Sequence, residues 1–165
     1  LGLLREDLSL AEPVFRNSDF LSFDLGTLKH NEAPGLHKLP NGLHSEDTCQ
    51  LAKYAGLSNR LKVFGLFGIN ASIEGVDLTL QLAAQVVWYF IQGFLQRNRR
   101  NPEDGEGFIV NNVEIPELNT PLTFYKNIET NQWWIEVQTF DNKKFYLACS
   151  KKDYIDASNN EIPEF

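Results

Sequence analysis

The sequence reads Asp19-Phe20-Leu21-Ser22-Phe23-Asp24-Leu25-Gly26 near its amino end, a nearly unbroken apolar run that stops at one carboxylate. Such a run has no polar side to alternate with an apolar one, which is typical of a parallel strand buried on both faces. The carboxyl ends of parallel strands face the ligand crevice, so the pattern aims Asp24 at a possible site. A structural alternative stays open, because aspartates at strand ends often cap or hydrogen-bond a loop.

One βαβ unit is predicted around this strand. A helix is expected to begin with Ser45 as its N-cap and to stop at Gly56, and a second apolar strand follows at 61–69. The connection 26–43 carries two strong turn signals, and loops this long inside compact domains are often functional. The order strand, loop, helix, strand predicts an α/β fold with a parallel sheet.

Two further helices are expected in this part of the chain. One covers residues 7–17, and the longest runs from Leu78 to Asn98 with Asp77 as its cap. Four glutamines of the long helix fall within about 60° of one another on a helical wheel, namely Gln81, Gln85, Gln92 and Gln96. This polar seam predicts a core helix that lies on a sheet, not a membrane span.

Composition changes at Asn101-Pro102, which predicts an α/β part at 1–100 and a small β-rich extension at 101–165. Three strands are expected there, at 122–125, 133–139 and 145–149, before a short helix capped by Ser150. The aromatic residues of this region could bind a ring or a sugar, but small antiparallel sheets need such residues for their core. They are Phe124, Tyr125, Trp133, Trp134, Phe140, Phe145 and Tyr146.

The overall composition is that of an ordinary globular protein. The 165 residues are 42% hydrophobic and 22% charged, with a net charge of −7. Since there is no basic surplus, nucleic acid is not an expected partner. The two cysteines have no metal-like spacing, and no signal peptide is visible, so we expect reduced thiols in a cytoplasmic protein.

Five short motifs occur in an order that resembles the C-terminal half of a ureohydrolase, the family of arginase, agmatinase and formimidoylglutamase. They are Ser22-Phe23-Asp24, Ala33-Pro34-Gly35, Asn41-Gly42-Leu43 with Glu46, Gly68-Ile69-Asn70 and Asp77-Leu78-Thr79. The resemblance covers roughly residues 5 to 100, and 101–165 are similar to extensions of formimidoylglutamase-like members. It implies part of a three-layer αβα fold with a parallel sheet, followed by a small antiparallel extension.

Family members hydrolyse guanidino or formimino C–N bonds with two Mn²⁺ ions bridged by hydroxide. By resemblance, Asp24 matches a metal-ligating aspartate. Gly26 stands where the family has a second aspartate, and Gly68 stands where it has the glutamate that contacts the substrate. The remaining family ligands belong to motifs upstream of this chain, so the resemblance implies Mn²⁺ that is absent or weakly held here.

The loops that follow the strands hold the other candidate site residues. Asn70 matches the family motif after the second strand, and His30 and His37 lie in the long connection. We expect these three residues to form a substrate loop if a ligand binds.

Three interpretations remain. The first is a ureohydrolase-like scaffold without catalysis, a binding or assembly subunit. The second is a Mn²⁺-dependent hydrolase of linear amidines whose other ligands lie upstream. The third is a protein-interaction module on the C-terminal aromatic sheet. Because two strands cannot cover both faces and edges of a sheet, we expect the upstream half of the same fold or a second copy as partner, and neither nucleic acid nor a membrane.

Overall fold

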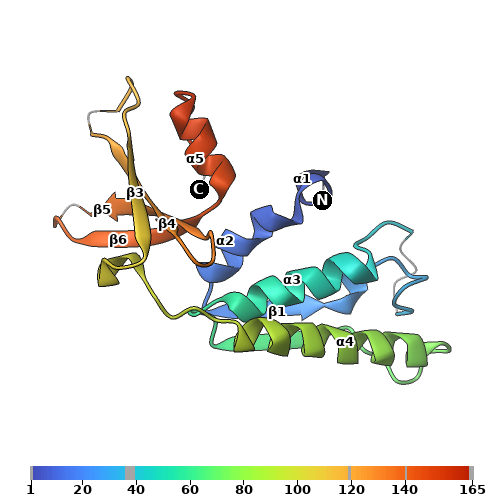
Figure 1. The fold of residues 1–165 in the computed structure, drawn as a ribbon. Coiled ribbons are helices and arrows are strands. Elements are labelled where there is room, and N and C mark those ends of the chain that lie inside the picture. Colours follow the sequence, from blue (N-terminus) through green and yellow to red (C-terminus); the bar gives the residue numbers. More distant parts are fainter. Residues whose placement is uncertain (1, 36–39, 119, 140, 164–165) are drawn as a thin grey trace. The chain divides into compact units, whose positions relative to one another are not determined.

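The computed structural model describes residues 2–35, 40–118, 120–139 and 141–163, apart from the side chain of Leu3. The chain divides into two compact units, Leu1–Arg97 and Asn98–Phe165. Figure 1 shows a helix-rich first unit and a second unit built on an antiparallel sheet. The chain is therefore a mixed α/β protein.

The first unit contains a parallel pair of strands with a helix between them, as the sequence predicts. Its elements are α1 (Gly2–Glu6), a 3-10 turn (Leu8–Leu10), α2 (Ala11–Arg16), β1 (Phe20–Asp24), α3 (Ser45–Leu57), β2 (Val63–Phe67) and α4 (Val76–Leu95). The register of β1 and β2 runs from Phe20 opposite Val63 to Asp24 opposite Phe67. The helix expected at 7–17 is split, since Asp7 accepts the N–H of Ser9 at 2.8 Å and opens the 3-10 turn instead.

The prediction that the first strand is buried on both faces is wrong for the described residues. Phe23 is 8% exposed and packs in the core with residues of α3 and α4. Phe20, Val63 and Phe67 are 57%, 52% and 51% exposed. The physical reason is that helices cover one face of this two-stranded sheet, and no described element covers the other.

The helix α3 continues through Gly56, so the expectation that this glycine ends the helix is wrong. A Cβ atom at Gly56 would overlap the carbonyl oxygen of Phe90 in α4, and one at Gly93 would overlap that of Lys53 in α3. The two helices therefore meet backbone to backbone, and the glycine is needed for close approach and not for a turn.

The helix α4 begins earlier and ends earlier than predicted. Its N-cap is Gly75, in the left-handed region at φ 80°, and Asp77 lies in the first turn, where negative charge is favourable. The expectation of a core helix holds for one stripe only, Thr79, Leu82, Ala83, Val86 and Gly93, which are buried. By length and composition α4 could also span a membrane, a test that core helices of soluble proteins pass as well.

The second unit is a four-stranded antiparallel sheet with a helix on one face. Its strands, in sheet order, are β3 (Phe108–Val113), β4 (Leu122–Asn127), β5 (Trp133–Gln138) and β6 (Lys144–Cys149), and α5 (Lys151–Ser158) follows. Three of these strands were predicted, and β3 was not. The core includes Phe124, Trp133 and Ile135, and Ser150 caps α5 by accepting the N–H of Asp153 at 3.2 Å.

We predict that Gly56→Ala lowers the free energy of unfolding by about 1–3 kcal/mol, because the added methyl group forces α3 and α4 apart. Helix propensity alone would change stability by about 1 kcal/mol in the opposite direction. Urea unfolding measures the difference. The matched control is Gly2→Ala, where a Cβ meets no atom within 4 Å; an equal response of both variants would contradict the close contact.

Candidate functional site

The carboxylate of Asp24 caps a short 3-10 turn that follows β1. Its Oδ1 accepts the N–H of Gly26 at 2.8 Å, and its backbone oxygen accepts the hydroxyl of Thr27 at 2.7 Å. These bonds open the 3-10 turn Leu25–Thr27, for which Asp24 is the N-cap. Asp24 therefore caps the loop after its strand, which is the structural alternative that the sequence analysis left open.

Gly68 follows β2 and lies against the Asp24 carboxylate. Its φ is +85°, a backbone conformation that favours glycine. A Cβ atom there would overlap Asp24 Oδ1 and lie 3.0 Å from the nitrogen of Gly26. The structure thus brings Asp24, Gly26 and Gly68 together at one strand end, and the space that a side chain at 68 would occupy is filled.

This strand end does not fit a centre of two divalent ions. Such a centre needs several anionic ligands, and Asp24 is the one carboxylate among the three residues that meet there. Within the described ranges, no group of three or more His, Cys, Asp or Glu side chains could hold a metal ion. Asp24 as a ligand stays a prediction.

For the other predicted site residues, the described part of the chain shows local surroundings only. The side chain of Asn70 accepts the N–H of Ser72 at 3.0 Å and so shapes the loop before α4. Nδ1 of His30 is buried without a hydrogen-bond partner. His37 lies outside the described residues. A substrate loop made of these residues therefore stays a prediction.

A polar cluster that the sequence analysis missed lies beside the amino end of α3. Glu32 accepts hydrogen bonds from the backbone N–H of Ser45 and, at 2.6 Å, from Nδ1 of His44. Nε2 of His44 lies 2.7 Å from the ammonium of Lys29. Because an ammonium donates, His44 accepts through Nε2 and carries its proton on Nδ1. The expected N-cap is also one residue off: His44 caps α3, and Ser45 is the first helical residue.

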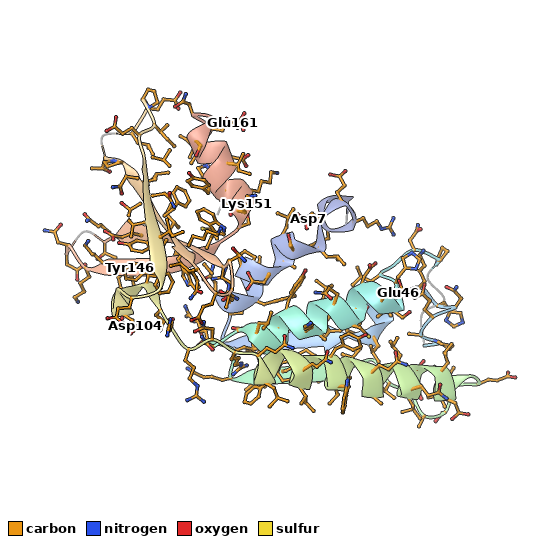
Figure 2. The ribbon with its side chains drawn as sticks, viewed as in Figure 1. Asp7, Glu46, Asp104, Tyr146, Lys151 and Glu161 are labelled. Atoms are coloured by element: carbon orange, nitrogen blue, oxygen red, sulfur yellow. The ribbon has the colours of Figure 1, made fainter. Side chains whose placement is uncertain are left out.

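Glu32 also lines a cavity of about 280 Å³ in the first unit. Figure 2 shows Glu46 at this amino end of α3. The cavity is lined by amide, hydroxyl and carboxylate groups together with two leucines and has room for a small polar molecule. Its lining residues are Asn31, Glu32, Ser45, Leu78, Gln81, Leu82 and Gln85.

The environment of Glu32 keeps its carboxyl ionised. Burial alone would raise the pKa of Glu32, but the hydrogen bonds from Ser45 and His44 outweigh burial and lower the pKa below its ordinary value. The sequence offered no signal for this cluster, because Glu32 and Ser45 are 13 positions apart and form no motif.

In the second unit, much of the aromatic cluster serves the core. Phe124 is fully buried, Trp133 stacks on Tyr154, and Trp134 is 9% exposed and meets Phe108 edge to face. Tyr125 donates to Glu136 at 2.8 Å. Burial raises the pKa of Tyr125, and the hydrogen bond to the negatively charged Glu136 raises it further. Phe140 lies outside the described residues.

We predict that Gly68→Ala destabilises the first unit by about 1–2 kcal/mol from the left-handed backbone alone, with a further loss from the overlap with Asp24. Gly105→Ala is the matched control, with φ +73° and no atom within 4 Å. Adding Asp24→Ala to Gly68→Ala should cost less than the two changes separately. Strictly additive losses in urea unfolding would contradict the contact.

We predict that Glu32→Gln lowers stability at pH 7. Because the pKa of Glu32 is depressed in the folded state, its contribution is present above the ordinary value of 4.5 and is lost as pH falls through the folded pKa. The difference between the unchanged protein and the variant should therefore shrink below pH 4.5, as measured by unfolding at several pH values. Glu46→Gln, at an exposed residue in the first turn of α3, is the control.

Comparison with family models and with curated proteins gave no match. Solved structures do match: formiminoglutamase from Trypanosoma cruzi, oxidized and with Mn²⁺ at pH 8.5, has a TM-score of 0.54 at 23% identity. An arginase superfamily protein from the same organism has a TM-score of 0.53 at 24% identity. Both matches cover 59% of this chain, and they cover 36% and 35% of the solved chains, so this chain spans about a third of their length. The matched part of the chain therefore has the fold of the formiminoglutamase and arginase superfamily structures.

Proposed function

We propose that this chain is a ureohydrolase-like scaffold that does not catalyse amidine hydrolysis and acts as a binding or assembly subunit. The observation that carries the proposal is the packing of Asp24, Gly26 and Gly68 at the ends of β1 and β2. Asp24 holds its own turn through Gly26, and Gly68 leaves no space for a longer side chain. The residues at which family members would place two further carboxylates offer none.

The chemistry of the family explains why this loss matters. Paired divalent ions lower the pKa of a bridging water and hold it against the amidine carbon, which requires enough anionic ligands to keep both ions close. With one carboxylate at this strand end, Mn²⁺ would be absent or weakly held. A cationic substrate would also lack the negative charge expected at position 68.

The second candidate is a Mn²⁺-dependent hydrolase of formimidoylglutamase type, with this chain as one portion of a three-layer αβα fold. Its support is the fold match to formiminoglutamase structures solved with Mn²⁺, which are almost three times as long as the part matched. In that case ligands outside this chain would complete the centre, and Asp24 would have to leave Gly26.

The uncovered apolar face of β1 and β2 supports a partner for the first unit. Parallel sheets are almost always covered on both faces, yet Phe20 and Val63 are more than half exposed. Further apolar side chains are exposed on α4, among them Trp88 and Leu95. We propose the remainder of the same fold, or a second copy, as the cover, in a cytoplasmic protein that binds neither nucleic acid nor membrane.

A metal-loading experiment separates the two candidates. The protein is incubated with Mn²⁺, freed of unbound ion, and assayed for metal content and for hydrolysis of formiminoglutamate and of a guanidino compound. The scaffold proposal predicts less than one equivalent of Mn²⁺ and no turnover. Stoichiometric Mn²⁺ with turnover that Asp24→Asn removes, and that the control Asp19→Asn keeps, would overturn it.

A further inference from the structure

The cavity beside the amino end of α3 is built from residues far apart in the sequence, and no residue of the strand ends is among those that line it. Its volume of about 280 Å³ lies just below the range of about 300–1,000 Å³ that is typical of ligand pockets, so it suits a small molecule. The loop before α3 contributes Asn31 and Glu32, α3 contributes its first residue, Ser45, and α4 contributes one face. The first unit therefore offers a place for a ligand other than the strand ends.

Glu32 brings an ionised carboxylate to this cavity without a full cationic partner. Its side chain is 18% exposed, and in the described part of the chain the imidazole of His44 is the one basic group in contact with it. That ring is neutral, because its Nε2 accepts from the ammonium of Lys29 and its proton lies on Nδ1. Largely buried charges are normally paired with an opposite charge, so the carboxylate favours a cation in the cavity.

The charges on the two helices that line the cavity act in the same direction. The first turn of α3 contains Glu46 and Asp47, and the first turn of α4 contains Asp77. The amino end of each helix carries about half a positive elementary charge, and Lys29 is the described cation of the polar cluster. The carboxylates outweigh the cation and the helix ends together, so the potential around the cavity is negative.

The other lining groups suit an ammonium ion on a short apolar chain. Leu78, Gln81, Leu82 and Gln85 follow the spacing i, i+3, i+4, i+7 and so share one face of α4. An ammonium has three donors, which match the carboxylate of Glu32 and two of the lining amide oxygens. The two leucines offer apolar contact to the chain. A bare metal ion fits less well, since no described group of three or more His, Cys, Asp or Glu side chains could hold one.

We propose that this cavity binds a small primary ammonium compound with a short alkyl chain, with the charge at Glu32 and the chain against Leu78 and Leu82. Recognition is by one charge-assisted hydrogen bond, by hydrogen bonds to side-chain amides, and by apolar contact with α4. The site is independent of whether the strand ends hold metal, because Asp24 and Gly68 do not line the cavity.

Titration of the unchanged protein in metal-free buffer, followed by NMR, tests the chemistry of the ligand. Butylammonium should shift the side-chain amide signals of Gln81 and Gln85 to a plateau, and should leave the signal of Gln92, on the same helix but outside the cavity, in place. Butanol, which lacks the charge, and butyrate, which carries the opposite charge, should give no plateau. The absence of a plateau with butylammonium, or equal binding of butanol or butyrate, would overturn the proposal.

Two pairs of variants test the residues with the same titration. Glu32→Gln should weaken butylammonium binding by about tenfold or more, because a hydrogen bond to a charged group is lost, whereas Glu46→Gln, exposed and outside the lining, should change it little. Since Glu32→Gln also lowers stability, Gln85→Leu at an exposed position gives a second measure, with a loss of about 2–10-fold that Gln92→Leu should not reproduce. Unchanged affinity in Glu32→Gln and Gln85→Leu, or equal losses in their controls, would contradict the site.

Discussion

The first unit depends on the backbone-to-backbone approach of α3 and α4. Gly56 and Gly93 lie against each other's helix, so close that neither has space for a side chain. The guanidinium of Arg97 donates to the carbonyl of Gly56 at 2.7 Å and satisfies an acceptor near the end of α3. Held together this way, the helices present one continuous apolar surface to the sheet, where Leu82 and Val86 share a core with Phe23.

That arrangement explains why helices cover only one face of the two-stranded sheet in the described part of the chain. Both long helices are used on the same face, so the apolar residues of the opposite face have no described partner. The strand ends, in contrast, are satisfied locally. Asp24 is bound to its own turn, and the more elaborate polar cluster is the one formed by Glu32, His44 and Lys29. The matched part of the chain thus has the fold of the solved structures, while the end of β1 is held by hydrogen bonds within its own turn.

The sequence predicted the elements that local pattern determines. The apolar runs of β1 and β2, the alternation of β5 and the cap at Ser150 are properties of neighbouring residues, and the structure confirms them. The strand β3 was missed because Asn111 and Asn112 are poor strand formers, and pairing with β4 is what makes the segment a strand.

The remaining errors have a common physical origin in contacts between distant residues. Gly56 was predicted to end α3, whereas in the structure it permits the close contact with α4. Ser45 was predicted to be an N-cap, but the backbone N–H of Ser45 donates to Glu32, which lies outside the helix. The candidate site was predicted as residue identities, whereas the way in which Gly68 constrains Asp24 is a property of two strand ends brought side by side.

The packing of Gly68 against Asp24 has a consequence for any redesign of this strand end. An acidic side chain cannot be introduced at position 68 by one substitution, since the aspartate and the left-handed backbone both oppose it. The turn at Gly26 would have to reopen first, so the change at position 68 depends on a change at Asp24 that precedes it.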